Sequence, residues 1–408
     1  MEKIIEFNLY KYELPLKTAL NIKNHQLTKR SGIIINIKTS SGFSSFGEIA
    51  PLPFFHKESL SQAFLQIKEI RKDILNKEIR GKAISDIKGS SKLPQMEILT
   101  GMVIDKGIFN FNLCNYFSDG FNFLKNIFSD FGVFPSVKFG IEMALLNLYF
   151  LNPDFEINLK STMGTALPVC RLLMDLKSDT SSEIEKIIKS GYKAIKIKVG
   201  REPAEQEISR IKKIKQLISK KSGNEIKLRL DSNGLWNLAE AVYFGNQIGN
   251  DAIEYIEDPV NDINEYKLFF KETGIPIALD EKLYDFIDIN NIDKANFNDL
   301  SYLKAFIIKP DFIGGFLRAS ELITIAKENG IMPVLSNSFD SSLAISSIAL
   351  FAGLMNLTKI PIGLDTLSCF RENLSKEDIK TAEGKINLME VLNNINKINF
   401  NLLEPADF

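Results

Sequence analysis

The second half of the chain repeats one pattern, in which short apolar runs alternate with longer amphipathic stretches. Each run is rich in β-branched or aliphatic residues, and each intervening stretch is long enough, at roughly 10 to 18 residues, to form a helix. Eight strands that alternate with helices in about 200 residues predict an α/β fold built on a (β/α) barrel. The runs cover residues 167–174, 194–199, 226–230, 252–256, 276–279, 305–308, 331–335 and 360–364.

A doubly wound parallel sheet also alternates strands with helices. That fold normally binds phosphate groups at a glycine-rich loop after an early strand. The candidate loop in this chain is Val199-Gly200-Arg201-Glu202, which holds a single glycine. The barrel is therefore the favoured architecture.

The first 60 residues or so carry a pattern typical of antiparallel strands. In residues 33–38 alternate isoleucines share one face, and Ser40-Ser41-Gly42 predicts a turn before a second run. Residues 59 to about 150 are mostly helical by pattern, apart from an irregular piece near 88–126. The tail from about residue 370 is of mixed character, and we expect it to pack on the amino-terminal part.

Composition excludes several classes of function. The 408 residues carry 50 Lys plus Arg and 51 Asp plus Glu, a formal net charge of −1, which argues against binding nucleic acid or an anionic membrane through bulk charge. The three cysteines lie far apart and fit neither a disulfide framework nor a zinc cluster, so we expect a cytoplasmic setting. The sequence shows no signal-peptide pattern and no run of about 18 apolar residues, so we expect no membrane span.

Histidine is rare in this chain. Two histidines, His25 and His56, argue against a catalytic triad that depends on histidine and nearly exclude a metal site made of several histidines. We expect both at the surface or in loops. Any catalysis should then depend on lysine, aspartate and glutamate.

Charged residues stand at the carboxyl ends of five consecutive runs, which is the rim where (β/α) barrels carry their catalytic groups. In residues 194–199 the period of two places Lys196 and Lys198 opposite the isoleucines, pointing into the barrel. The same alternation turns Arg229, Asp231 and Asn233 inward. The ends of the next three runs, at intervals that each fit one strand and one helix, are Glu257, Asp280 and Lys309.

Three carboxylates, Asp231, Glu257 and Asp280, would therefore converge on one point. They cannot all stay charged there without a counter-ion. A divalent cation resolves the repulsion, and ligation by oxygen atoms with open positions favours Mg²⁺, or Mn²⁺, over zinc.

Lysines from two strands would stand on opposite sides of that cation, Lys198 on one and Lys309 on the other. A neighbouring ammonium, that of Lys196, and partial burial should both lower the pKa of Lys198. A lysine with a lowered pKa is suited to proton transfer.

These residues resemble the motif set of the enolase superfamily, in its muconate-lactonizing branch. The set consists of Lys196-Ile197-Lys198, Asp231-Ser232-Asn233, Glu257-Asp258-Pro259, Asp280-Glu281 and Lys309-Pro310. Four further segments are similar to the o-succinylbenzoate synthase group of that superfamily: residues 47–53, 135–142, 336–343 and 363–366.

The resemblance implies a modified (β/α)7β barrel of the TIM type with an α+β capping domain. It predicts the capping domain at 1–135, the barrel with the active site at 136–368, and a carboxyl-terminal segment at 369–408 that completes the capping domain. The chain departs from the family at Cys170-Arg171, near the end of the first barrel strand, where a small pair similar to Asn-Gly is usual. Either Arg171 reshapes the substrate pocket or the strand has a different register.

The resemblance also implies a reaction. It is the metal-assisted syn dehydration of 2-succinyl-6-hydroxy-2,4-cyclohexadiene-1-carboxylate to 2-succinylbenzoate in menaquinone biosynthesis, through an enediolate that Mg²⁺ stabilises. By this resemblance Lys198 is the base, Lys309 stabilises the anion, and Lys196 is a further catalytic residue. Asn233 and Glu281 are expected to orient the metal ligands or Lys198.

The expected substrate is a small anionic molecule. We expect a loop and a turn late in the barrel to hold its succinyl carboxylate. Residues 17–30 of the capping segment carry basic side chains, and we expect them to form a lid over the anionic substrate. Two alternatives remain: an N-succinylamino acid racemase or dipeptide epimerase that uses both lysines as bases, and a non-catalytic barrel that acts as a binding protein. The sequence leaves the oligomeric state open. The residues expected to contact the succinyl carboxylate are Ser336, Ser338, Ser341 and Gly363.

Overall fold

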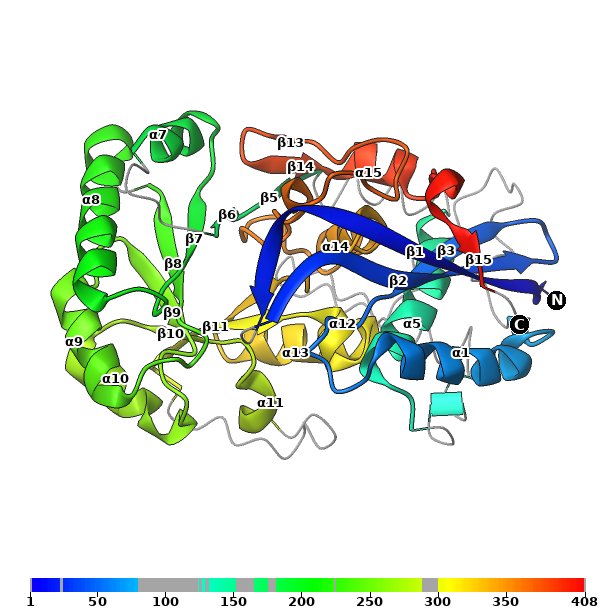
Figure 1. Cartoon of the computed structure of the whole chain (residues 1–408), viewed down its shortest axis with the longest axis horizontal. Coiled ribbons are helices and arrows are strands. Elements are labelled where there is room, and N and C mark those ends of the chain that lie inside the picture. The colour runs from blue at the N-terminus through cyan, green and yellow to red at the C-terminus, as the bar shows by residue number, and fades with distance from the viewer. Residues whose placement is uncertain are drawn as a thin grey trace.

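The computed structural model describes residues 2–22, 25–79, 124, 127–128, 132–151, 165–174, 181–223, 225–287 and 300–406. The irregular piece expected near 88–126 lies almost wholly outside these ranges. Within them, the chain forms a parallel sheet surrounded by helices and an antiparallel sheet beside it (Figure 1). No helix in these ranges is long and apolar enough to cross a membrane.

Seven strands of the described chain form the curled parallel sheet, in the order β12-β11-β10-β9-β8-β7-β6. Each overlaps the run predicted for it, so the alternation of apolar runs and helices is confirmed. The strands are β6 (Arg171–Leu173), β7 (Ala194–Lys198), β8 (Lys227–Asp231), β9 (Ile253–Glu257), β10 (Ile277–Leu279), β11 (Leu303–Ile308) and β12 (Met332–Leu335).

The eighth run, residues 360–364, closes this sheet through single bridges. Ser336 pairs with Gly363, and Val169 pairs with Ile362, both in parallel orientation. The Gly363 N–H donates to Leu335 O at 2.8 Å, which continues the pairing from β12. The parallel sheet is therefore a TIM-type barrel, as predicted.

Helices cover the outside of the barrel, and Figure 1 shows α8, α9 and α10 along the outer side of β7 to β10. The helix α8 buries isoleucines every three or four residues, from Ile208 to Ile218, which explains why it packs on the barrel. Gly223, at φ 59°, ends this helix in the left-handed conformation. The helices after the first strand are α7 (Ser181–Lys189), α8 (Ala204–Ser222), α9 (Leu238–Ile248), α10 (Tyr266–Thr273), α11 (Leu283–Phe286), α12 (Pro310–Ile313), α13 (Phe316–Glu328) and α14 (Ser342–Leu354).

The amino-terminal part forms the antiparallel sheet, with the turn at residues 40–42 as predicted. Its three longest strands are β1 (Glu2–Ile22), β2 (His25–Thr39) and β3 (Ser44–Ile49), and β4 (Glu78–Ile79) pairs with β1. The isoleucines 33, 35 and 37 are buried, and so is Ile34 on the other face, so the sheet is covered on both sides. Its helices are α1 (Leu60–Ile74) and α5 (Pro135–Phe150).

Two glycines allow α5 to approach β3 closely. A Cβ atom on Gly47 would lie 2.0 Å from the backbone oxygen of Gly140, so neither surface leaves room for a larger residue. The Ser45 hydroxyl donates to Ala144 O at 2.6 Å, and the Asn147 amide donates to Phe46 O at 2.8 Å. The contact fixes the helix on the sheet.

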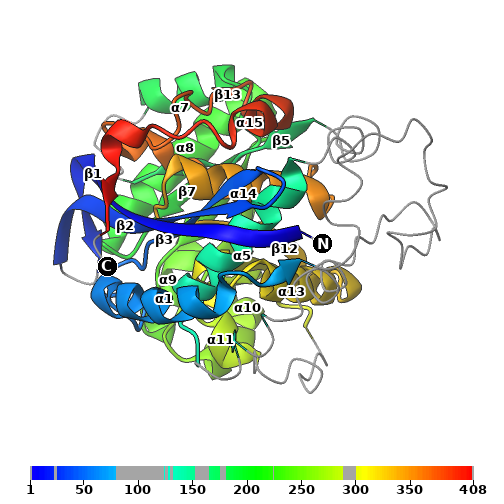
Figure 2. The same cartoon turned by 90° about the vertical axis from the view of Figure 1, so that its right-hand side faces the viewer.

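The carboxyl-terminal segment returns to the amino-terminal sheet, as predicted. Strand β15 (Glu404–Pro405) pairs with β1, and Figure 2 shows this red segment beside the blue strand. The side chain of Asn396 also donates to Ser44 O at 2.8 Å. The boundaries at 135 and 368 stay a prediction. The other elements here are β13 (Thr381–Ala382), β14 (Lys385–Asn387), which pairs with β5 (Ala166–Pro168), and α15 (Leu388–Asn394).

Candidate active site

The three predicted carboxylates meet at one rim of the barrel. Asp231 ends β8, Glu257 ends β9 directly beside it in register, and Asp280 follows β10. Each offers an oxygen atom within 4.8 Å of the others, and all three residues are buried. Three convergent carboxylates form an all-oxygen donor set, which fits Mg²⁺ or Mn²⁺.

The inward alternation of the strands brings three lysines to these carboxylates. The ammonium of Lys196 lies 2.9 Å from Asp231 and 2.5 Å from Glu257. On one side, Lys198 lies 2.7 Å from Asp231. The Lys309 ammonium lies 2.7 Å from Asp280, so the charged groups balance within the barrel.

The two outer lysines differ in their environments. Burial lowers the pKa of Lys198, and the ammonium groups of Lys196 and Lys309 lower it further, against the attraction of Asp231. Burial also acts to lower the pKa of Lys309, but the Asp280 carboxylate outweighs it and raises that pKa above its ordinary value. The lowered pKa of Lys198 agrees with the sequence-based expectation, and it favours Lys198 as a proton acceptor.

The acidic groups also differ from one another. Burial would raise the pKa of Asp231, but Lys196 and Lys198 hold it well below its ordinary value. For Glu257 burial dominates over Lys196, and its pKa is raised. A set of neighbouring groups whose pKa values are pushed in opposite directions is typical of active sites.

Asn233 contacts the groups that it was expected to orient. Its side-chain oxygen accepts a hydrogen bond from Lys198 Nζ at 2.9 Å, and its backbone N–H donates to Asp231 at 3.1 Å. The residue has a φ of 50°, in the left-handed region that asparagine tolerates better than most residues. Asn233 therefore links the Asp231 carboxylate with Lys198.

Asp258 holds the loop that carries Asp280, a role that the sequence reading did not assign. Its buried carboxylate accepts hydrogen bonds from the backbone N–H groups of three successive residues, 280 to 282, at 3.3, 2.9 and 3.3 Å. Glu281 is the middle one of the three and also lines the adjacent pocket. The only sequence signal was an acidic residue between Glu257 and Pro259 in the quoted motif.

The loop from Ser336 to Ser342, which we call the serine loop, lies between the barrel and the capping domain. The Ser336 hydroxyl donates to Gly363 O at 3.3 Å, and the Ser341 hydroxyl donates to Glu48 at 2.5 Å. Ser338 is buried in the same loop. Contact of these residues with a succinyl carboxylate stays a prediction. Two of the hydroxyls, those of Ser336 and Ser341, already donate to protein oxygens.

The expected lid residues include one that is buried. Arg30 donates to Phe339 O at 2.9 Å and to Ala50 O at 2.6 Å, so it joins the β1–β2 hairpin to the serine loop. Near the tip of the hairpin, His25 stacks on Phe54 with ring centroids 3.7 Å apart. The hairpin is thus fixed to both neighbouring loops.

The structure decides between alternatives that the sequence left open for two residues. His56 lies in a loop, one of its two expected placements, and is buried there with its ring packed on Phe312. Arg171 does not face the pocket: it pairs in register with the outward-facing Ile195 and forms an ion pair with Asp365 at 2.8 Å. The first strand has a different register from the one assumed, with Leu172 beside the inward-facing Lys196.

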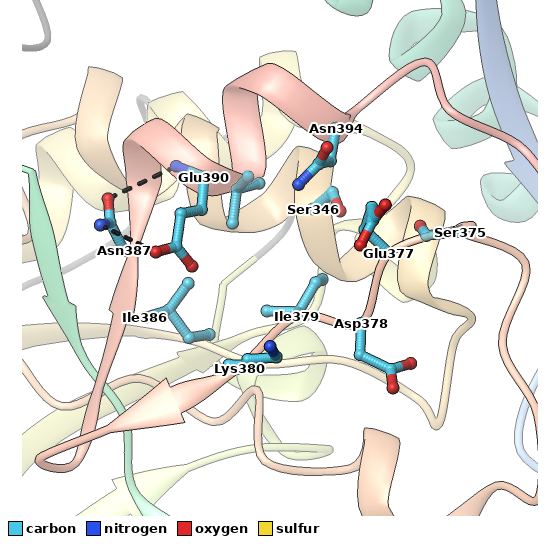
Figure 3. Close-up of a pocket in the computed structure, with 11 residues that line it drawn as sticks. Ser346, Ser375, Glu377, Asp378, Ile379, Lys380, Ile386, Asn387, Glu390 and Asn394 are labelled. Atoms are coloured by element: carbon cyan, nitrogen blue, oxygen red, sulfur yellow. Dashed lines mark hydrogen bonds between the residues drawn. The ribbon is translucent and has the colours of Figure 1, made fainter.

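Two hollows of different size lie in the described part of the chain. One of about 360 Å³ is lined by capping residues 55–58 and by barrel-loop residues that include Asn233, Glu281 and Tyr284. The other, between α14 and the carboxyl-terminal segment, measures about 10 Å³, room for about one water molecule (Figure 3). The first has the size of a small-molecule site and lies beside the carboxylates.

Two family models match the chain. The enolase C-terminal domain-like family matches residues 179–391, and the MenC N-terminal domain matches residues 4–88. The o-succinylbenzoate synthase of Vibrio cholerae serotype O1 is 29% identical over 90% of this chain and 90% of its own length. The protein PHYLLO of Arabidopsis thaliana is 27% identical over 87% of this chain. The matched part is 20% of the length of PHYLLO, so this chain spans about a fifth of that relative.

Solved structures share the fold at low sequence identity. The L-Ala-D/L-Glu epimerase from Bacillus subtilis has a TM-score of 0.69 and 20% identity, with 100% of both chains covered. The muconate lactonizing enzyme from Pseudomonas fluorescens has a TM-score of 0.68 and 18% identity, with 99% of this chain and 97% of that chain covered.

Proposed function

The chain belongs to the enolase C-terminal domain-like family, and we propose that it is an o-succinylbenzoate synthase, which dehydrates 2-succinyl-6-hydroxy-2,4-cyclohexadiene-1-carboxylate to 2-succinylbenzoate. The unequal environments of Lys198 and Lys309 carry this proposal. A one-base elimination needs one lysine that accepts a proton and one that stays charged. The MenC N-terminal match and the synthase relatives support the same substrate.

The carboxylates of Asp231, Glu257 and Asp280 would hold a divalent metal ion. When bound, that ion supplies positive charge against the second negative charge that builds on the substrate carboxylate as its α-proton leaves. Asp258 and Asn233 keep two of the three carboxylates in place through backbone contacts.

Lys198 would carry out both proton transfers. As the neutral amine, its Nζ takes the α-proton, and the electron pair of the broken C–H bond moves into the carboxylate. The resulting ammonium then gives the proton to the departing hydroxyl on the same face. The C–O bond breaks, water leaves, and the ring becomes aromatic. Asn233, which accepts from Lys198 Nζ at 2.9 Å, orients it for both steps.

Lys309 would remain protonated throughout. A lysine is ordinarily an ammonium near neutral pH, and nearby Asp280 raises the pKa of Lys309 above its ordinary value. In the proposed complex this ammonium faces the carboxylate cluster from the side opposite to Lys198. It therefore stabilises negative charge without moving a proton. Lys196, between Asp231 and Glu257, adds positive charge at the same place.

A racemase or epimerase of N-acylamino acids is the second candidate, since it would need the same two lysines. The purified protein, incubated with Mg²⁺ and the cyclohexadiene, should produce an aromatic product that is followed by ultraviolet absorbance. An N-succinylamino acid is assayed in parallel for loss of optical activity. Racemisation without aromatisation would favour the second candidate.

A further inference from the structure

The turn after β11 meets the capping domain at a group of rings, which we call the aromatic cluster: Phe55, His56, Tyr284 and Phe312. Phe312 lies at its centre, with ring centroids 4.5 Å from Phe55, 5.5 Å from His56 and 4.9 Å from Tyr284. The cluster therefore joins the capping segment after β3 to the barrel segment that follows Lys309.

Both ring nitrogens of His56 have defined neighbours. The backbone N–H of Leu52 donates to Nδ1 at 2.9 Å, so a proton on the ring must be on Nε2. That Nε2 lies 3.3 Å from the Asp311 carboxylate, and both side chains are buried. Burial acts to raise the pKa of Asp311, but His56 and the nearby Lys309 lower it below its ordinary value, so a carboxylate faces the imidazole.

Asp311 lies in the short helix α12, two residues after Lys309. Backbone N–H groups of Phe312 and Ile313 both donate to Lys309 O at 3.0 Å, so this turn is continuous with the lysine. A contact that fixes Asp311 also fixes the backbone from which Lys309 projects.

Phe55, the residue before His56, contacts Lys309 directly. The ammonium lies 4.8 Å from the centre of the Phe55 ring, within the range of a cation–π interaction. Lys309 also donates a hydrogen bond to Asp280, one of the three carboxylates that would hold the metal. A carboxylate shared with a divalent ion attracts an ammonium less, so the contact with the Phe55 ring gains weight for the placement of Lys309 once a metal is bound.

We propose that His56 is a positioning residue for Lys309, which acts through Asp311 and through the placement of Phe55. The capping domain then contributes to catalysis by holding the anion-stabilising lysine, besides covering the pocket. The kinetic part of the proposal rests on the proposed function; the structural part rests on the contacts alone.

Three variants of the full chain test this role. His56→Leu removes the contacts with Leu52 N–H and Asp311 and puts an apolar side chain of similar volume in place of the ring. His56→Gln keeps an N–H group that can reach Asp311. Ser347→Ala is the matched control, because it removes another buried hydrogen bond, at 3.0 Å to Asn147, outside the aromatic cluster.

The kinetic readout is kcat for dehydration with Mg²⁺ present, in wild-type and Lys309→Arg backgrounds. We expect His56→Leu to lower kcat about 10- to 100-fold, with little change in KM or in calorimetric Mg²⁺ affinity. His56→Gln should recover most of the loss, and Ser347→Ala should show none. In the Lys309→Arg background His56→Leu should add little, because the positioned group is already changed. An equal loss in both backgrounds overturns the proposal.

A crystal structure of His56→Leu gives a readout that needs no activity. We expect the Phe55 ring to leave the Lys309 ammonium; a ring that stays in place overturns the proposal. If the wild-type protein does not convert the cyclohexadiene, the proposed function fails and this structure still decides the role of His56. Should His56→Leu not fold, Asp311→Asn, which keeps the side-chain size, takes its place in both measurements.

Discussion

Replacing Asp258 with alanine would remove the acceptor that holds the loop after β10. The carboxylate accepts hydrogen bonds from three successive backbone N–H groups and from the Tyr266 hydroxyl. The hydrogen bond from Glu281 N–H is the shortest of the four at 2.9 Å, and that from the Tyr266 hydroxyl measures 3.2 Å. The variant leaves these donors without their acceptor next to Asp280. We therefore expect both the fold and the metal site to be weakened.

The expected magnitude follows from opposing effects. Each buried donor left unpaired costs about 1 to 3 kcal/mol. Two effects reduce the total: Asp258 borders the pocket, so water can reach part of the loop, and burial together with Asp280 raises its pKa to about 8, so the carboxylate is itself costly to keep charged. We expect the free energy of unfolding to fall by about 2 to 4 kcal/mol and the Mg²⁺ affinity to fall about 10- to 100-fold.

Urea unfolding and calorimetric titration with Mg²⁺ measure the two effects. Asp262→Ala is the matched control. Asp262 is an exposed aspartate in the loop after β9, which also carries Asp258, and its carboxylate accepts from the Asn264 backbone N–H at 2.9 Å. The control should lose less than about 1 kcal/mol and keep its Mg²⁺ affinity. If Asp258→Ala behaves like Asp262→Ala in both measurements, Asp258 does not hold the metal site.

Three further predictions concern the metal and pH. A chelator should abolish turnover and Mg²⁺ or Mn²⁺ should restore it; activity in verified absence of metal would contradict this. Asp231→Ala and Glu257→Ala should each stop turnover, with the circular dichroism spectrum unchanged; an active variant would show that its residue is not a ligand. Burial raises the pKa of Glu142 from 4.5 to about 7, so the stability it contributes is full below about pH 4.5 and is lost as the pH rises through 7. This loss amounts to roughly 3 kcal/mol in the free energy of unfolding. Glu142→Gln keeps an acceptor for the Leu317 N–H and should remove this pH dependence when unfolding is measured across the same pH range. An unchanged slope of the unfolding free energy against pH would contradict the prediction.

Much of the barrel could be predicted because its information is local. The period of two in β7 turns Lys196 and Lys198 inward whatever surrounds the strand, and the same holds for Arg229, which is buried against Tyr255. The spacing of one strand and one helix then brings the strand ends to a common rim. The convergence of Asp231, Glu257 and Asp280 followed from these two regularities.

Local pattern failed where a long-range contact decides the outcome. The burial of His56 within its loop has no local signal, because the residues that bury it, Asp311 and Phe312, lie more than 250 positions away in the sequence. The sequence left two placements open for Arg171, because a strand of three residues leaves its register undetermined until the neighbouring strand is known.

The serine loop shows the same limit for function. A hydroxyl in a loop next to a pocket is a reasonable candidate for binding an anion. Yet Ser341 caps α14 and donates to Glu48, a residue 293 positions earlier in the chain. No local feature of residues 336–342 indicates that contact. The role of Asp258 was hidden for a related reason, since its partners are backbone groups that have no sequence signature.

The most direct test of the proposed reaction compares Lys198→Ala with Lys309→Arg in deuterated solvent, with both proteins verified as folded and metal-bound. Lys198→Ala should stop both dehydration and exchange of the substrate α-proton. Lys309→Arg keeps a positive charge but cannot act as a base, because arginine is effectively never deprotonated. It should therefore retain measurable dehydration. If Lys309→Arg is as inactive as Lys198→Ala, Lys309 transfers a proton and the one-base elimination is contradicted.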